Sequence, residues 1–105
     1  MKNLAVNTIM FAQAQINYTD LCCADGKKHT ISKTLKKVEQ DLLVTGQFLC
    51  INKGFLINIS FVKSFLVDES KVYMNNDMVF SISRRRLKAL RTTLKNQITS
   101  NLYDL

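Results

Sequence analysis

Three consecutive arginines near the C-terminus, Arg84, Arg85 and Arg86, carry the most distinctive chemistry in this sequence. An arginine guanidinium offers a planar fork of N–H donors, which matches the oxygens of a phosphate or the acceptor edge of a guanine base. From residue 83 to the C-terminus the formal net charge is +5, whereas the first 82 residues together contribute only +2. The basic residues of this last segment are Arg84, Arg85, Arg86, Lys88, Arg91 and Lys95. Charge concentrated in this way indicates a polyanion as the partner.

A second basic position lies in a polar interruption of the most apolar part of the chain. Residues 48–67 are rich in Phe, Ile, Leu and Val, and Asn52, Lys53 and Gly54 break this run. Residues of these types favour a turn or a bulge. Because a charged side chain inside so apolar a segment has to reach water, we expect Lys53 to lie at the surface.

The residue types that catalysis or metal binding would need are few and scattered. The single histidine, His29, follows two lysines, and the carboxylates show no paired spacing for general acid–base chemistry. The cysteines are Cys22, Cys23 and Cys50. Adjacent cysteines on an extended segment point to opposite faces, so they neither bridge readily nor share a metal ion. The sequence therefore predicts no enzyme, no metal site and no cofactor, with reduced cysteines and an exposed His29 on a strand.

Length and composition limit the architecture. A chain of 105 residues suffices for one domain with its own core, and 47% hydrophobic with 22% charged residues is ordinary for a globular protein. The apolar runs are interrupted well before the ~20 residues that a membrane span requires. We therefore expect a single domain over residues 1–105, with its core at about residues 4–98, in a cytoplasmic protein without membrane insertion.

The first third of the chain has the pattern of β-strands. We expect strands over residues 4–14, with a break near Asn7, over residues 16–24 and over residues 28–32. The pair Asp25-Gly26 predicts a tight hairpin turn in which both central residues have positive φ. A β-hairpin or meander should result.

A helix and further strands are predicted downstream. The helix covers residues 32–43, with Ser32 or Thr34 as its N-cap and Gly46 at its end. Its apolar face consists of residues at helical spacing, Leu35, Val38 and Leu42. After the apolar segment that holds Lys53, the last strands are expected at residues 62–67, 71–74 and 78–83, separated by polar turns.

The arginine triplet stands where the last predicted strand gives way to a second helix. An apolar stripe at helical spacing follows residue 83, formed by Leu87, Leu90, Leu94 and Ile98. At ~100° per residue, Arg85 lies nearly opposite this stripe, whereas Arg84 lies on its flank with other basic residues. Ser83 fits the N-cap, although cations in a first turn oppose the helix dipole. Arg85 is therefore expected to point away from the core.

Two motifs, in order along the chain, resemble those of the LytTR DNA-binding domain, the output module of AlgR/AgrA/LytR-type transcriptional regulators. The first is FLCINKGFLIN at residues 48–58, which resembles the family's F-x-R-I-H-R-S-x-L-V-N segment. The second is FSISRRRLK at residues 80–88, which resembles its closing P-V-S-R-R junction between strand and helix. The opening TIMFAQA, residues 8–14, is similar to the family's I-x-Y-I-E-A strand. The predicted hairpin turn and first helix also fall at family positions, so the resemblance covers about residues 4–94.

This resemblance implies a mainly β fold of elongated antiparallel β-sheets with two short helices. It implies sequence-specific binding of double-stranded DNA as the output domain of a bacterial transcriptional response regulator. A receiver or sensory domain is expected on the full-length protein, and a homodimer on repeated DNA sites. Family members place loop residues and the C-terminal junction into successive major grooves. The DNA-binding residues that the resemblance implies are Arg85, Arg84, Arg86, Lys53, Asn52 and Tyr18. The charged flank of the second helix adds Lys88 to this set.

The loop around Lys53 departs from the family pattern at three positions. Cys50 stands at the usual arginine, Asn52 at the usual histidine and Gly54 at the usual serine, while Lys53 keeps the basic character. On chemical grounds Arg85 is expected to read a base, and Asn52 can read adenine or bind a phosphate. The residues expected to contact the phosphate backbone are Arg84, Arg86, Lys53 and Lys88.

Two other classes of function are compatible with the same features. Basic charge together with Tyr18, Phe55 and Tyr73 fits a module for RNA or single strands, if these aromatic rings are exposed together on one sheet face. A protein-interaction domain would instead present the apolar stripe of the C-terminal helix to a partner. That surface would consist of Leu87, Leu90, Leu94, Ile98 and Leu102.

Overall fold

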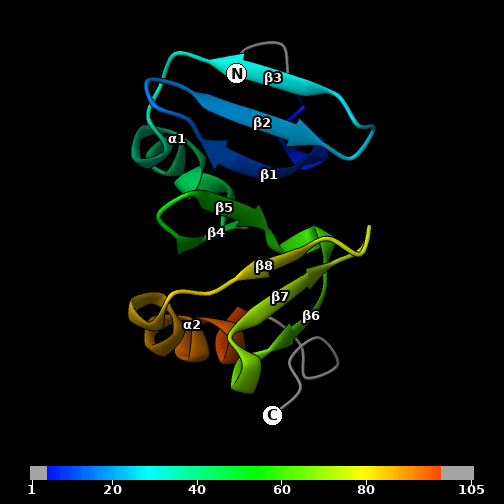
Figure 1. Ribbon diagram of the computed structural model, residues 1–105, viewed down its shortest axis with the longest axis vertical. Helices are drawn as coiled ribbons and strands as arrows, with labels where there is room; N and C mark the ends of the chain where they lie inside the picture. Colours follow the sequence, from blue (N-terminus) through cyan, green and yellow to red (C-terminus); the bar gives the residue numbers. More distant parts are fainter. Residues whose placement is uncertain (1–4, 98–105) are drawn as a thin grey trace. The chain divides into compact units, whose positions relative to one another are not determined.

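The fold is mainly β, with two antiparallel sheets and two short α-helices in the residues that the structure describes, 5–97 (Figure 1). This structure is a computed structural model. It divides into two compact units, residues 1–60 and residues 61–105, each with a sheet of its own. The fold class predicted from the sequence is confirmed, and the single domain over residues 1–105 stays a prediction.

The first unit is a five-stranded antiparallel sheet with one α-helix. Its strands are β1 (Ile9–Ala14), β2 (Thr19–Cys23), β3 (Lys28–Ile31), β4 (Phe48–Asn52) and β5 (Phe55–Asn58). They are arranged in the order β3-β2-β1-β5-β4. The helix α1 (Leu35–Leu42) lies between β3 and β4 in the sequence. This unit also contains the 3-10 turns η1 (Val6–Thr8) and η2 (Leu43–Thr45), and a third, η3 (Ile59–Phe61), spans the boundary to the second unit.

One face of this sheet forms a hydrophobic core with α1. Ala12 pairs with both Leu21 and Leu56 across three central strands, so the three side chains share one face. All three are fully buried, and the apolar face of α1 belongs to the same cluster through Leu35, Val38 and Leu42. Each of the leucine and valine side chains in this cluster contributes about 1.5–3 kcal/mol when it is removed from water. The predicted helical spacing is therefore confirmed as a packing face.

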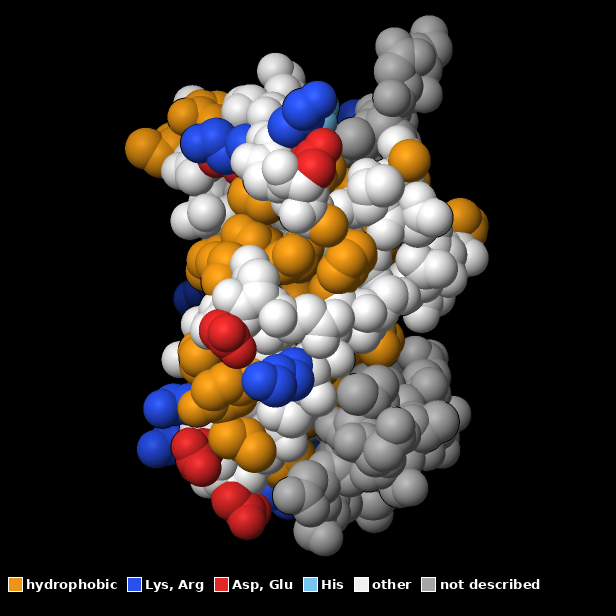
Figure 2. Space-filling view, turned by 90° about the vertical axis from the view of Figure 1, so that its right-hand side faces the viewer, with side chains coloured by type: hydrophobic (Ala, Val, Ile, Leu, Met, Phe, Trp, Pro, Cys, Tyr) orange, Lys and Arg blue, Asp and Glu red, His pale blue; other side chains and the backbone are white. Residues whose placement is uncertain are grey.

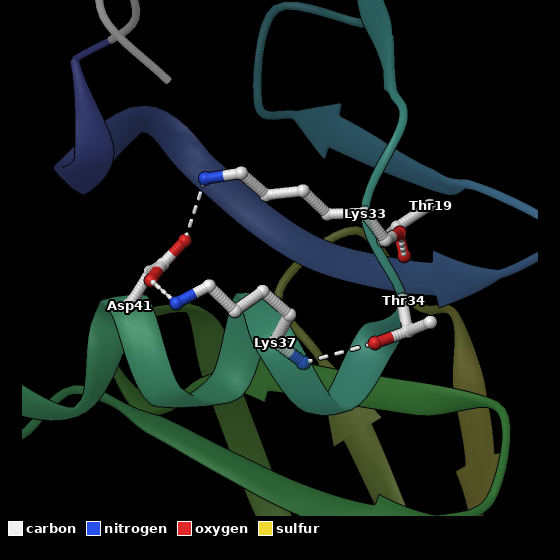
Figure 3. Close-up of polar contacts among 5 residues, drawn as sticks. All are labelled: Thr19, Lys33, Thr34, Lys37 and Asp41. Atoms are coloured by element: carbon white, nitrogen blue, oxygen red, sulfur yellow. Dashed lines mark hydrogen bonds and ion pairs between the residues drawn. The ribbon is translucent and has the colours of Figure 1, made fainter.

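Polar contacts fix the start of α1 (Figure 3). The Thr34 hydroxyl oxygen accepts a hydrogen bond from the Lys37 backbone N–H at 3.2 Å, so Thr34 is the N-cap and the helix begins three residues later than residue 32. Asp41 accepts from Lys33 Nζ at 2.7 Å and pairs with Lys37 Nζ at 3.3 Å. These bonds, that of Lys33 first, lower the pKa of Asp41. The Thr19 hydroxyl donates to the Lys33 carbonyl at 2.7 Å, which joins β2 to the segment before the helix.

The end of α1 differs slightly from the prediction. The α-helix ends at Leu42, and the chain continues as η2 to Gly46, whose φ of 65° is left-handed. Glycine adopts this conformation at little cost, which explains why the helical segment stops there.

The β2–β3 hairpin has a different turn from the one predicted. Only Gly26 has a positive φ (88°), and Asp25 does not. The Gly26 N–H donates to the Cys23 carbonyl, and the Cys23 N–H donates to the Lys27 carbonyl. This pattern is a three-residue loop that ends in a left-handed residue, which needs one positive φ rather than two.

Strand boundaries also differ from the predictions, three of them by more than one residue. Residues 6–8 form η1 instead of the start of a strand, because Thr8 bonds back to the Ala5 carbonyl through both its N–H and its hydroxyl. The second strand begins at Thr19, since residues 15–18 form the β1–β2 loop. The last strand ends at Ser81, since Ser83 already caps the next helix.

The second unit is a three-stranded antiparallel sheet followed by α2. Its elements are β6 (Val62–Leu66), η4 (Val67–Glu69), β7 (Lys71–Met74), β8 (Val79–Ser81) and α2 (Arg84–Gln97), and the sheet order is β6-β7-β8. Phe65, Val72 and Phe80 pair across the three strands and are buried. On α2, Leu90 is buried and Leu87 half-buried. The side chain of Leu94, together with Ile98 and Leu102, lies outside the described residues.

Candidate nucleic-acid interface

Two loops that are far apart in the sequence meet at one end of the five-stranded sheet. The β1–β2 loop (residues 15–18) and the β4–β5 loop (Lys53-Gly54) are neighbours because β1 and β5 pair in antiparallel register, with Gln13 opposite Phe55 (Figure 1). The Ala14 N–H donates to the Gly54 carbonyl at 2.8 Å, which joins the two loops directly. The structure thus brings the predicted contact residues Tyr18 and Lys53 to the same end of the sheet.

The side chains of these loops differ in exposure. Tyr18 lies in the β1–β2 loop and is 42% exposed, so it is not a core tyrosine. Lys53 is exposed at the tip of its loop, as predicted, and Asn52 is half-buried at the end of β4. Ile16, at the tip of the β1–β2 loop, is 94% exposed. Sequence reasoning placed Ile16 in a strand, and its polar neighbours Gln15 and Asn17 were the only signal for a loop.

The β4–β5 loop is held by side-chain bonds. Asn52 Oδ1 accepts from the Gly54 N–H at 2.8 Å, and the Cys50 thiol donates to the Asn52 carbonyl at 3.3 Å. The pairing of β4 with β5 also shifts register between Cys50 and Asn52. The predicted turn or bulge is confirmed, and it combines both features.

The arginine triplet occupies the first turn of α2. Ser83 is the N-cap, because the Arg86 N–H donates to its hydroxyl oxygen at 3.3 Å and the Leu87 N–H to its carbonyl at 2.9 Å. Arg84 and Arg85 are exposed, and Arg86 is half-buried. The strand β8 ends two residues before this cap, so the arginines follow the end of the three-stranded sheet closely.

The charge of this turn is not neutralised by the described carboxylates. The ion pairs found among the described residues are those of Asp41 with Lys33 and Lys37, and of Asp77 with Lys63. None of them involves Lys53, Lys88 or residues 84–86, and the first turn of α2 contains no acid. By contrast, the face shown in Figure 2 carries both basic and acidic side chains. The arginine turn has the charge that a phosphate backbone requires.

The two alternative functions find less support. Phe55 is half-buried, with its ring centroid 6.0 Å from that of Phe11, while Tyr73 is half-buried on β7 of the other sheet. Tyr18 lies in a loop, so the three aromatic rings do not form one exposed sheet face. Leu90, in the middle of the proposed partner stripe of α2, is buried.

Groups with catalytic or metal-binding chemistry are not assembled in the described part of the chain. No cluster of three His, Cys, Asp or Glu side chains is found there. Cys22, Cys23 and Cys50 form no disulfide, and burial raises the pKa of the Cys22 thiol, which disfavours a reactive thiolate. His29 is exposed on β3, as predicted. None of the described helices is long and apolar enough to cross a membrane.

The fold is mainly β, and its exposed basic groups fit a polyanionic partner. The profile of the LytTR DNA-binding domain matches residues 1–95. The chain therefore belongs to the LytTR family, a family of DNA-binding domains and not of enzymes.

A solved structure supports the fold independently. The chain is similar to the LytTR DNA-binding domain of a protein from Bacillus cereus that is described as a methyl-accepting/DNA response regulator. The TM-score is 0.75 at 19% sequence identity, over 87% of this chain and 84% of the other. Among curated protein sequences no match is found.

Proposed function

We propose that this chain binds double-stranded DNA sequence-specifically, as the output domain of a bacterial transcriptional response regulator. The observation that carries the proposal is the arginine turn at the start of α2, which is capped by Ser83, exposed at Arg84 and Arg85, and free of ion pairs with the described carboxylates. Family membership supports DNA as the polyanion.

Within this turn we assign base readout to Arg85. It lies nearly opposite the leucine stripe, and Leu90 of that stripe is buried, so the Arg85 guanidinium extends away from the packed side of α2. An arginine fork donates to guanine O6 and N7 in the major groove. We assign phosphate contacts to Arg84, Arg86 and Lys88.

The loops of the five-stranded sheet supply further contacts in this proposal. Lys53 is an exposed cation for the phosphate backbone, and Tyr18 lies exposed in the neighbouring loop. Asn52 belongs to the same loop as Lys53. We propose that the two units act together as one DNA-binding domain over residues 1–105.

The assignment of Arg85 is tested by comparing two duplexes, one selected from a random-sequence pool and one scrambled. Arg85→Ala should lower affinity for the selected duplex by about 1–3 kcal/mol and barely change affinity for the scrambled one. Fluorescence anisotropy titrations measure both. Lys36→Ala removes an exposed lysine of α1 that has no proposed contact, and it serves as the matched control. An equal loss on both duplexes for Arg85→Ala contradicts base readout.

The backbone contacts are tested by salt dependence. Lys53→Ala and Arg84→Ala should weaken binding to both duplexes alike and reduce the slope of log K against log salt by about 1 each. A wild-type affinity that does not change between low and moderate salt would exclude phosphate neutralisation as the main driving force. Competition by single-stranded DNA and RNA separates the proposal from a single-strand module, since the duplex should compete best.

The cellular context is also part of the proposal. The chain would act in the cytoplasm, with a receiver or sensory domain on the same polypeptide and as a homodimer on repeated DNA sites. The receiver or sensory domain is supported by the response regulator from Bacillus cereus, whose LytTR domain has the same fold.

A further inference from the structure

The β4–β5 loop is organised by bonds among the residues that differ from the family pattern. Asn52 Oδ1 accepts from the Gly54 N–H at 2.8 Å, and the Cys50 thiol donates to the Asn52 carbonyl at 3.3 Å. We propose that Asn52 is a positioning residue that fixes the Lys53 turn for contact with DNA and does not itself read a base. This inference rests on the DNA-binding function proposed above.

The backbone of this loop lacks the usual lock of a two-residue hairpin. Such turns normally have a positive φ at one or both central residues. Neither Lys53 nor Gly54 has one. The bond from Gly54 to the Asn52 side chain, an Asx-turn, takes its place, because the amide oxygen mimics a backbone acceptor. The conformation at Lys53 therefore depends on Asn52.

The direction of the Asn52 side chain agrees with this role. Reading adenine bidentately requires both the amide oxygen and the amide nitrogen to face the base edge. Here the oxygen points back into its own turn at Gly54, and the residue is half-buried, while Lys53 beside it is exposed. The Asn52 side chain thus faces the backbone of its own turn, and Lys53 faces solvent.

The positioning extends to the neighbouring loop. The Gly54 carbonyl accepts from the Ala14 N–H at 2.8 Å, at the end of β1 where the β1–β2 loop begins. The N–H of Gly54 is held by Asn52 and its carbonyl by β1, so the residue after Lys53 is fixed on both sides. A fixed backbone lowers the entropy that Lys53 loses when it orders on a phosphate.

A double-mutant cycle on the selected duplex tests the dependence on Lys53. Asn52→Ala should weaken binding about two- to tenfold, the range that corresponds to one net hydrogen bond. In the Lys53→Ala background the same change should have no further effect, because the residue that it positions is gone. Equal losses in both backgrounds would mean that Asn52 contacts DNA independently, which overturns the inference.

Asn52→Asp separates positioning from base readout, and it decides the question even if Asn52→Ala fails to fold. The aspartate keeps Oδ1 as an acceptor, so hydrogen exchange of the Gly54 amide, measured by NMR, should stay as slow as in the wild type. Its added negative charge should weaken binding to the selected and scrambled duplexes by the same factor. A collapse of the ratio between the two affinities, with the Gly54 amide still protected, would show direct readout by Asn52.

Asn76→Ala is the matched control. Asn76 Oδ1 accepts from the Met78 N–H at 3.1 Å in the β7–β8 turn, the same type of bond outside the proposed contact residues. Its removal should leave DNA affinity unchanged. Failure of the proposed function gives a different result from failure of this inference: the wild type would then show no salt-dependent duplex binding at all, whatever residue 52 is.

Discussion

Asn58 is a buried polar residue whose replacement gives a quantitative test of the first unit. It is fully buried at the end of β5, where its Nδ2 donates to the Ile9 carbonyl at 2.9 Å and its Oδ1 accepts from the Ser60 N–H at 2.9 Å. The first bond joins the end of β5 to the start of β1, beyond the last backbone pair, Phe11 with Ile57. The Asn58 side chain therefore extends the pairing of β1 with β5 beyond their backbone pairs.

The cost of Asn58→Ala follows from the two bonds. Ile9 is fully buried, so its carbonyl would find no water, and an unpaired buried acceptor costs about 1–3 kcal/mol. Ser60 is exposed, so its N–H can turn to water and the loss there is about 1 kcal/mol. We expect a total destabilisation of about 2–4 kcal/mol, which lowers the melting temperature by roughly 10–25 °C.

Urea unfolding followed by circular dichroism measures this difference. Asn17→Ala, at an exposed asparagine of the β1–β2 loop, is the control and should change stability by less than about 0.5 kcal/mol. Asn58→Asp keeps the acceptor for Ser60 but replaces the donor for Ile9 with a buried negative charge, so at neutral pH it should destabilise at least as much as Asn58→Ala. If Asn58→Ala were no more destabilising than Asn17→Ala, the role assigned to the Ile9 bond would be wrong.

Two further predictions concern single side chains. The pKa of Asp20 is lowered, first by the hydrogen bond from the Thr30 hydroxyl (2.6 Å), so its stabilising contribution is present above the unfolded-state pKa and is lost as the pH falls through the lower native pKa. Thr30→Val should raise the Asp20 pKa in an NMR titration, and an unchanged value would contradict this assignment. Asp77, in the β7–β8 turn, has a φ of 70°, a left-handed conformation like that of Gly26 (88°) in the β2–β3 turn. Asp77→Val should therefore destabilise the protein by about 1–2 kcal/mol, while Asp77→Gly should not. Both changes remove the exposed ion pair with Lys63, so equal melting temperatures for the two variants would argue against backbone strain.

Local patterns in the sequence predicted the elements more reliably than their limits. The helical spacing of Leu35, Val38 and Leu42 identified the buried face of α1 correctly. Its boundaries depended on a choice between two capping residues, and the structure selects Thr34. Similarly, Asp25-Gly26 located a hairpin turn correctly, but the number of loop residues depends on strand register, which two residues do not determine.

Local patterns could not predict that the loops of Tyr18 and Lys53 lie at the same end of the sheet. Tyr18 and Lys53 come together because β1 pairs with β5, and more than thirty residues separate those strands. Such pairing depends on the packing of the whole sheet. The resemblance to the LytTR family did imply that both residues contact DNA. The hydrogen bond within the Asn52 turn does have a local signal, asparagine two residues before glycine.

The arginine turn of α2 sets stability against function. Three cations in a first turn that contains no acid lie at the positive end of the helix dipole, where acidic residues would stabilise the helix. A protein selected only for stability would place aspartate or glutamate after Ser83. In this chain the free domain therefore loses part of its folding free energy at that turn. If the turn binds DNA as proposed, the bound polyanion would offset that loss, and acidic substitutions at positions 84–86 that raise the heat resistance of the isolated domain would weaken its binding to DNA.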